Sequence, residues 1–270
     1  MIWVHQFPVP GPISDALAAS ASLGHYADAA GISEVREAIA GFYSRHFGIM
    51  TDPGRVIVGN GSKELLFLIF PWSAGPSSSP LHHGSVMHHS YGSSENHTTY
   101  YLPGRRTAIR SIRQTFDGLL RSLVAGQHIL LLNNPHNPTG AVYSREELQA
   151  IADVCRSDGA LVLADEIYAL TTYDRESFVS MGTIFPDGTF VTGGLSKDRS
   201  AAGYRFGTCV LPSECSEKMV ADFAKVAATL YTNITTRCCK LKLGSSSLGS
   251  PACASCCTTD RSSRVHVGND

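Results

Sequence analysis

The sequence predicts an α/β protein with a mainly parallel sheet flanked by helices. Segments of helical periodicity alternate with short strand-like runs from Ser33 onward, which is the pattern of a parallel α/β sheet. The run at 128–133 is almost entirely apolar, as expected of a strand buried on both faces. With 270 residues and 43% hydrophobic content, the chain can bury a substantial core, in one large domain or in a large and a small one.

The first part of the chain predicts a helix, a strand and a second helix. The first helix follows a Ser33 cap and has one apolar face, formed by Val35, Ala38, Ile39 and Phe42. Residues 55–59 predict a strand that ends at Asn60-Gly61. Residues 62–70 predict the helix that leaves this strand.

The later part continues the alternation after the strand at 128–133. Ser144 and Glu147 form a capping-box pattern that opens a helix with Leu148, Ile151, Ala152 and Cys155 on one face. Residues 160–164 and 189–193 predict two more strands. A last amphipathic helix is indicated by Met219, Phe223, Val226 and Leu230.

Two stretches lack any period, and they set the expected organisation. Residues 72–110 are irregular over a length unusual for a loop in a compact domain, and the pattern also fails after Thr236. We therefore expect an N-terminal segment at 1–50, a large domain at 51–236, and a disordered Ser- and Cys-rich tail at 237–270. A shifted reading frame or an erroneous gene model is one hypothesis for both stretches, and transcript sequencing tests it.

Charge and hydropathy exclude several classes of partner. The net charge of -1 gives no reason to expect nucleic acid or an anionic membrane surface. The start of the chain lacks the basic region and apolar run of a secretory signal, and no segment is long enough to span a bilayer. A cytoplasmic location is the expectation.

The eight cysteines do not predict a disulfide framework, because a chain of this length builds a core without one. Five of them lie in the tail, at Cys238, Cys239, Cys253, Cys256 and Cys257. Their spacing could hold zinc, but the tail has no periodicity that would fix a site. We expect no metal site.

Four polar motifs follow one another between Asn133 and Gly207. They are Asn-Asn-Pro-His-Asn-Pro-Thr-Gly at 133–140, Ala-Asp-Glu-Ile-Tyr at 164–168, Ser-Lys-Asp-Arg at 196–199 and Gly-Tyr-Arg-Phe-Gly at 203–207. Asp165 comes at the carboxyl end of an apolar strand, where side chains of an open α/β sheet face the ligand crevice. Such residues also occur as turn residues, helix caps or surface charges, and Ser196-Lys197 alone would also fit a Ser-Lys hydrolase pair.

Gly61-Ser62-Lys63 stands at a strand-to-helix turn, where free backbone N–H groups and the helix dipole favour an anion. Gly59 and Gly61 could be mistaken for the start of a dinucleotide fingerprint. The third glycine of that fingerprint is missing, because position 64 is Glu. The turn therefore predicts an anion site but not a nicotinamide site.

The four motifs in this order resemble the class I/II aminotransferase family, whose members use pyridoxal 5′-phosphate (PLP) and have fold type I. The resemblance covers roughly residues 7–72 and 127–236. It implies the PLP-binding large domain of such an enzyme, with an incomplete small domain. It also implies a homodimer, in which Tyr26 reaches a phosphate across the interface.

The resemblance assigns a role to each motif. Lys197 matches the lysine that holds the cofactor as a Schiff base, and Asp165 matches the carboxylate that pairs with the pyridinium N–H. Asn137 and Tyr168 match the donors to the ring's 3-hydroxyl oxygen. The phosphate ligands are implied to be Gly61, Ser62, Lys63 and Arg205.

Three departures from the family pattern stand beside these matches. Gly194 occupies the position where members usually have a serine or threonine that binds phosphate. The aromatic residue that stacks on the cofactor should fall at 72–110, where Tyr91 and Tyr100 lack the expected context. The arginine that binds the substrate carboxylate lies in the family's C-terminal small domain, and the surroundings of Arg237, Arg261 and Arg264 do not match it.

The function implied is transfer of an amino group between an amino acid and a 2-oxo acid, through a Schiff base on Lys197. A PLP-dependent lyase of the same fold shares these ring-binding residues, so fold and cofactor residues do not fix the reaction. No arginine here matches the one that binds the substrate carboxylate in the family. A third hypothesis is therefore a truncated PLP-binding chain without catalysis.

Overall fold

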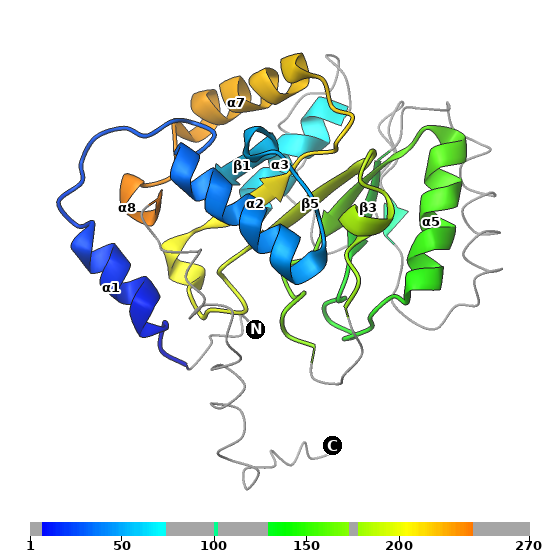
Figure 1. The fold of residues 1–270 in the computed structure, drawn as a ribbon, viewed down its shortest axis with the longest axis horizontal. Helices are drawn as coiled ribbons and strands as arrows, with labels where there is room; N and C mark the ends of the chain where they lie inside the picture. Colours follow the sequence, from blue (N-terminus) through cyan, green and yellow to red (C-terminus); the bar gives the residue numbers. More distant parts are fainter. Residues whose placement is uncertain (1–6, 74–99, 102–128, 173–177, 240–270) are drawn as a thin grey trace, which may run out of the picture.

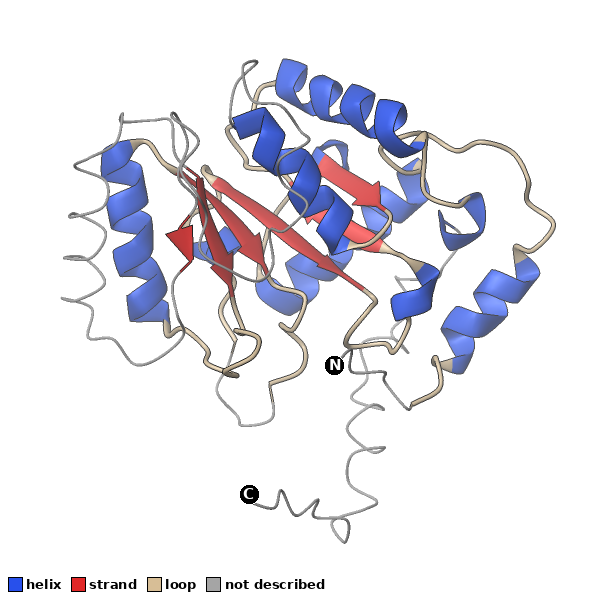
Figure 2. Ribbon diagram, turned by 180° about the vertical axis from the view of Figure 1, so that it is seen from behind, coloured by secondary structure: helices blue, strands red, loops and turns tan. Residues whose placement is uncertain are grey.

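The computed structural model describes residues 7–73, 100–101, 129–172 and 178–239. Within these residues, a central sheet is covered by helices on both faces (Figures 1 and 2). The strands are β1 Val56–Gly59, β2 Tyr100–Tyr101, β3 Ile129–Asn133, β4 Leu161–Asp165, β5 Thr189–Gly194 and β6 Gly207–Val210. Their order across the sheet is β1-β6-β5-β4-β3-β2.

The sheet is mainly parallel, as predicted. Strands β2, β3, β4 and β5 pair in parallel, and β6 runs antiparallel to both of its neighbours, β5 and β1. The predicted strands at 55–59, 128–133, 160–164 and 189–193 are confirmed within one residue at each end. The sequence reading missed β6, whose four residues are too few to show a period.

The described helices are α1 Gly11–Ala19, α2 Ser33–Phe47, α3 Ser62–Ser73, α5 Arg145–Asp158, α6 Met181–Ile184, α7 Glu217–Tyr231 and α8 Thr236–Cys239. Short 3-10 turns occur at Pro53–Arg55 and Ala202–Tyr204. Among the described helices, none is long and apolar enough to cross a membrane.

Alternation along the strands divides the core between the two faces of the sheet. Val58 and Val191 pack with α1 and α2 on one face, and Ile57 and Phe190 pack with α3 and α7 on the other. Helices α5 and α6 cover the first face over β3 and β4, where Val162 is fully buried. The result is a three-layer arrangement, helix–sheet–helix (Figure 2).

The capping box predicted for α5 is confirmed. The Ser144 hydroxyl accepts a hydrogen bond from Glu147 N at 3.2 Å, and the Glu147 carboxylate accepts one from Ser144 N at 2.8 Å. The helix ends at Gly159, whose φ of 72° is the left-handed conformation that glycine adopts at low cost. The predicted apolar face, Leu148, Ile151, Ala152 and Cys155, is buried.

Two local expectations are wrong. Ser33 is not the cap of α2: Ile32 occupies that position, and the Ser33 hydroxyl donates to Glu37 at 3.0 Å inside the helix. Val226 and Leu230 of α7 are 41% and 54% exposed, because the helix turns Phe223 and Ala227 toward the sheet instead.

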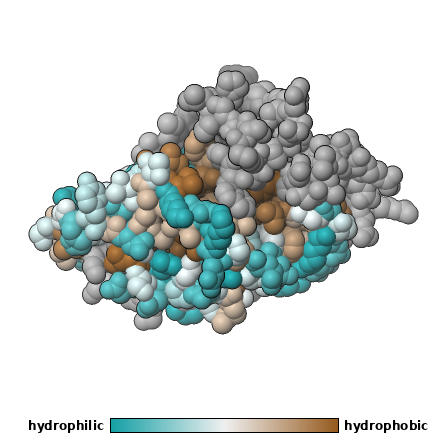
Figure 3. Space-filling model, turned by 90° about the horizontal axis from the view of Figure 1, so that it is seen from above, coloured by the Kyte–Doolittle hydropathy of each residue, from teal (hydrophilic) through white to brown (hydrophobic). Residues whose placement is uncertain are grey.

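Seen from the side of α7, the described surface is mostly hydrophilic, with smaller hydrophobic areas (Figure 3).

The two irregular stretches lie largely outside the described residues. Helix α3 continues through Ser73, and Tyr100–Tyr101 forms β2, so 72–110 is not irregular throughout. Tyr91 falls outside the described residues, as do Arg261, Arg264 and the tail cysteines from Cys253 onward. Within 237–270, the structure describes only the end of α8.

Candidate functional site

The site lies where β3, β4 and β5 end at the same edge of the sheet. Asn133 pairs in register with Asp165, and Asp165 pairs with Thr192, so the carboxyl-terminal parts of three parallel strands lie side by side. The Asn133 amide donates to the Asp165 carbonyl oxygen at 3.0 Å. This is the edge at which open α/β sheets bind ligands.

Asp165 is the buried anionic group of this edge. Burial raises the pKa of its carboxyl to about 6, whereas hydrogen bonds from Ile167 N and Thr192, and the nearby Lys197 and Lys63, act to lower that pKa. The hydrogen bond from Ile167 N is 3.4 Å long. A buried carboxylate that faces cations, but is only weakly hydrogen-bonded, is suited to pair with a further cationic group.

Asn137, Tyr168 and Lys197 come together beside Asp165. The Asn137 amide donates to the Tyr168 hydroxyl at 3.1 Å, and Asn137 N donates to the Asn133 side chain at 2.8 Å. Lys197 Nζ lies 5.5 Å from the centroid of the Tyr168 ring. The fold thus assembles residues from three of the four polar motifs.

Arg205 brings the fourth motif to the turn between β1 and α3. Its Nη2 donates to the Asn60 carbonyl oxygen at 3.1 Å. The Glu64 carboxylate accepts from Asn60 N at 2.8 Å, so it bonds backbone that precedes the helix. The first N–H groups of α3, at Ser62 and Lys63, have no acceptor within the helix and are available to an anion.

Glycines keep this turn open. A Cβ at Gly61, whose φ is 91°, would lie 2.2 Å from Arg205 Nη2. A Cβ at Gly207 would lie 2.5 Å from Ser62 N. The Arg205 guanidinium and the backbone at Gly207 can therefore approach the Gly61–Ser62 backbone more closely than a residue with a Cβ would allow. The backbone N–H groups of the turn stay uncovered as a result.

These groups define what a ligand must carry. It needs an anionic end for the turn at Gly61–Lys63 and Arg205, a cationic or protonated nitrogen for Asp165, and an oxygen for the Asn137–Tyr168 pair. A carbonyl carbon within reach of Lys197 could form an imine with its amine. PLP carries all four features, so the residues present fit this cofactor.

The comparison with protein families agrees with the geometry. A family model described as aminotransferase class I and II matches residues 7–253. The chain belongs to this family.

Relatives of this aminotransferase family member are similar along most of its length. Aspartate aminotransferase of Geobacillus stearothermophilus is 28% identical over 248 residues, which cover 84% of the chain and 59% of that relative. An asparagine–oxo-acid transaminase of Streptococcus mutans is 27% identical over 219 residues, covering 78% and 53%. The chain therefore spans about three-fifths of the first relative's length and about half of the second's.

Solved structures share the fold. Aspartate aminotransferase of Thermus thermophilus superposes with a TM-score of 0.69 at 24% identity, over 88% of the chain and 62% of that structure. The aromatic aminotransferase of Pyrococcus horikoshii gives 0.67 at 22% identity, over 88% and 64%. The fold is that of a type I PLP enzyme, and the chain matches about three-fifths of the length of these structures.

Tyr26 is the one predicted site residue that the structure leaves apart. Its side chain is 83% exposed in the connection between α1 and α2. In the ranges that the structure describes, no hydrogen bond or ring contact joins it to Lys197, Asp165 or Arg205. Its contact with a second subunit stays a prediction.

Close packing explains why position 194 is glycine. Its φ is 153°, and a Cβ there would lie 2.4 Å from the Phe206 carbonyl oxygen, since β5 and β6 pass closely at this point. A serine or threonine would clash, so this family member cannot place the usual hydroxyl at that position.

Sequence reasoning missed Glu166, the second buried carboxyl. Burial raises its pKa to about 8, against hydrogen bonds from the Ser180 hydroxyl and Met181 N, both 2.9 Å long. Glu166 follows Asp165 directly, and successive side chains at a strand end point to opposite faces. Its role is to hold the start of α6, and the adjacent acidic pair was the signal for it.

No cluster of three or more metal-ligating side chains occurs among the described residues. Cys155, Cys209 and Cys215 are buried and form no disulfide.

Proposed function

We propose that this chain binds PLP at Lys197 and is the cofactor domain of an aminotransferase that acts on an amino acid and a 2-oxo acid. The convergence of Lys197, Tyr168 and Asp165 at the end of three parallel strands supports the proposal most directly. Residues 51–236 would form the cofactor-binding domain, and residues 1–50 the segment leading into it.

Each end of the cofactor has its own set of residues. Asp165 would pair with the ring nitrogen, and the ionised form of its carboxylate is stabilised by that cationic partner. Asn137 and Tyr168 would donate to the ring oxygen. The phosphate would be held by Gly61, Ser62 and Lys63 at the start of α3, together with Arg205, whose guanidinium can form a bidentate ion pair.

When bound, PLP supplies an electron sink for charge that develops at the substrate's Cα. Lys197 would hold the cofactor covalently until an incoming amino acid takes its place. The freed amine then lies in the same site and acts as the base and acid that moves the Cα proton. Tyr168, which Lys197 Nζ faces, keeps that amine over the site.

A second copy of this chain is the proposed partner. The 83% exposed Tyr26 side chain has no role within the described part of one subunit, and the site of a neighbouring subunit would give it one. No feature of charge suggests a nucleic acid.

Cofactor binding without turnover is the second candidate. Of the two arginines that follow Lys197 most closely, Arg199 is paired with Asp198, and Arg205 is assigned to the phosphate, so neither is left to bind a substrate carboxylate. The two candidates differ in turnover and not in cofactor binding.

The first test is to titrate the purified chain with PLP, trap the adduct with borohydride and locate the modified lysine by peptide mass spectrometry. We expect one label per chain on Lys197, its loss in Lys197→Ala, and no loss in Lys218→Ala on the exposed face of α7. Label scattered over several lysines would refute the proposed site.

Turnover is then measured with a panel of amino acids. Formation of a 2-oxo acid that requires a second 2-oxo acid as acceptor identifies an aminotransferase. Pyruvate and ammonia released without an acceptor identify a lyase instead. Stoichiometric label on Lys197 with neither product identifies the non-catalytic candidate.

A further inference from the structure

The two residues after Lys197 form an ion pair that is mostly buried. Asp198 and Arg199 form an ion pair at 3.0 Å, and their side chains are only 10% and 14% exposed. Arg199 also donates to the Asp198 carbonyl oxygen at 3.3 Å. Lys197 faces the Tyr168 ring, while its two neighbours line a cavity together with residues of α1 and α2, so they anchor the loop through a separate set of contacts.

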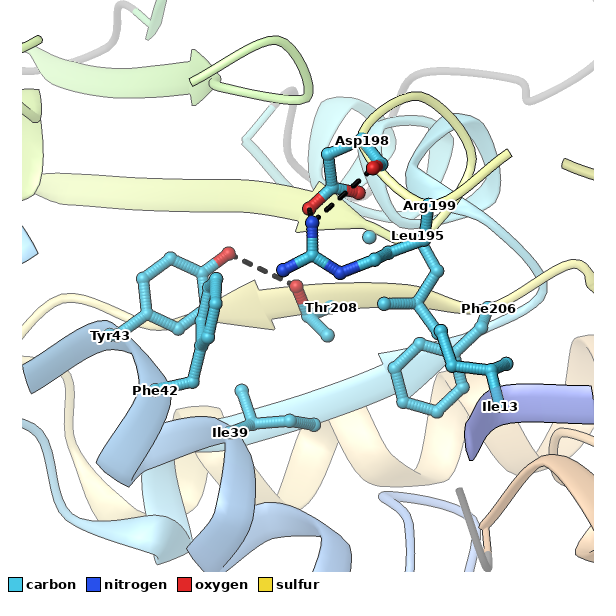
Figure 4. A pocket seen from close by; sticks show the side chains of 10 residues that line it. Ile13, Ile39, Phe42, Tyr43, Leu195, Asp198, Arg199, Phe206 and Thr208 are labelled. Carbon is cyan, nitrogen blue, oxygen red and sulfur yellow. Dashed lines mark hydrogen bonds and ion pairs between the residues drawn. The ribbon is translucent and has the colours of Figure 1, made fainter. Parts of the chain in front are cut away.

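The ion pair lines a cavity of about 50 Å³ between the loop and the N-terminal helices (Figure 4). Ile13 of α1 and Phe42 of α2 line it, together with Phe206 at the far end of the loop. The Tyr43 hydroxyl, also in its wall, bonds to Thr208 of β6 at 3.0 Å. The cavity thus joins α1, α2 and the Lys197 loop through one buried cluster.

The loop has an unusual backbone. Ser200 and Arg205 have φ angles of 51° and 52°, and Thr232 is the remaining described non-glycine residue with a positive φ. Side chains other than glycine adopt this left-handed region only when the surroundings hold them there. Hydrogen bonds from Ala201 N to Leu195 O, and from Leu195 N to Phe206 O, close the loop at 3.1 and 3.2 Å.

A gain in folding stability explains this buried ion pair poorly. Burial raises the pKa of the Asp198 carboxyl, while Arg199 lowers it, and Asp198 Oδ1 has no hydrogen-bond partner among the described residues. The desolvation of two charges offsets much of their attraction. A buried pair of this kind can instead fix one arrangement of the chain.

We propose that Asp198 and Arg199 are positioning residues that hold Lys197 toward Tyr168 and Asp165 by anchoring the peptide that follows it. The role in catalysis rests on the proposed function, because it requires Lys197 to carry the cofactor. The positioning of Lys197 does not rest on the proposed function, because the orientation of this side chain can be measured without PLP.

The experiment compares wild type with Asp198→Asn, Arg199→Gln and Arg199→Lys. In the cofactor-free chain, competitive acetylation followed by mass spectrometry gives the reactivity of Lys197 relative to the exposed Lys218. With PLP added, the absorption of the adduct gives the rate of attachment, and near-ultraviolet circular dichroism reports the folded state.

We expect Lys197 to approach the reactivity of Lys218 in Asp198→Asn and Arg199→Gln, with attachment about tenfold slower or more, because a displacement of about 1 Å is costly for a positioned group. Arg199→Lys keeps the charge pair and should restore part of the rate. Asp153→Asn, which breaks the exposed ion pair with Arg156 on α5 and leaves the reference Lys218 untouched, is the matched control and should change neither readout.

Folded Asp198→Asn and Arg199→Gln chains with wild-type Lys197 reactivity and attachment rate would overturn the proposal. So would loss of the folded state in all three variants at the pair, since the pair would then be structural. If wild type takes no label at Lys197 with PLP but its cofactor-free reactivity shifts as expected, the proposed function fails and the positioning stands.

Discussion

The Asn137 side-chain amide donates a hydrogen bond to the Tyr168 hydroxyl across 3.1 Å, joining two motifs that are 31 residues apart. The same tyrosine presents its ring to Lys197 Nζ. One side chain therefore links the segment after β3 to the lysine after β5, and both links can be tested separately.

Tyr168→Phe keeps the ring and removes the hydroxyl. We expect PLP affinity to fall about fivefold, the equivalent of about 1 kcal/mol for one hydrogen bond. Asn137→Ala should have a similar effect, and the double variant should lose less than the sum of the two single losses, because each single variant also removes the hydrogen bond that the two side chains share. Isothermal titration measures the affinities, and strictly additive losses would contradict the coupling.

Asp165 predicts a pH dependence of cofactor binding. Its pKa is about 6 in the folded chain, so the carboxylate is ionised above that pH and becomes protonated below it. PLP affinity should therefore fall as the pH drops below about 6. Asp165→Asn should lower the affinity more than tenfold at neutral pH, a loss of about 1.4 kcal/mol or more, and should remove the contribution of this carboxyl to the pH profile. An unchanged affinity in Asp165→Asn would exclude pairing with the ring nitrogen.

Glu166 predicts a pH dependence of stability. Its folded pKa of about 8 lies above the usual value of 4.5, so between these values the folded chain holds a proton that the unfolded chain releases. Stability should fall as the pH rises through this window, by up to about 1.4 kcal/mol per pH unit. Glu166→Gln keeps an oxygen for Ser180 and Met181 N, and should flatten this decline in denaturant unfolding. A decline of the same slope in Glu166→Gln would assign it to other groups.

Substitution of Gly207 tests whether the turn at Gly61–Lys63, the proposed phosphate site, is sterically constrained. Gly207→Ala places a Cβ 2.3 Å from the Gly61 carbonyl carbon, so the turn must move. We expect a loss of about 1–3 kcal/mol in unfolding free energy and weaker binding of PLP and of inorganic phosphate. Gly203→Ala is the control in the same loop, because a Cβ there has no atom within 4 Å. Equal behaviour of the two variants would show that the turn is not constrained.

The sequence predicted the strands that carry the site because their apolar runs are local signals. The predicted strand at 160–164 and the capping box at Ser144 needed no tertiary information, and both are confirmed, the strand within one residue at each end. Lys197, Asp165 and Asn137 could be proposed from motif order, since strands in a parallel sheet bring their carboxyl ends to one edge.

Features set by packing were not predictable in the same way. The exposed side of α7 depends on how the helix rotates against α3 and the sheet, and Val226 and Leu230 have the spacing of a buried face without being buried. Strand β6 is antiparallel in an otherwise parallel sheet, and its four residues carry no period that shows direction. Helix-cap positions such as Ser33 shift by one residue for similar reasons.

By itself, the sequence determined the alternation of helices and strands, the identities of the candidate cofactor residues and their order. Those follow from side-chain chemistry and local spacing, which are properties of the chain. Only the tertiary structure decided that Asp198 and Arg199 form a mostly buried ion pair, that Gly194 is required by Phe206, and that Asp165 and Glu166 have raised pKa values. Burial and close approach depend on residues far apart in the chain, so they exist only once the layers have packed.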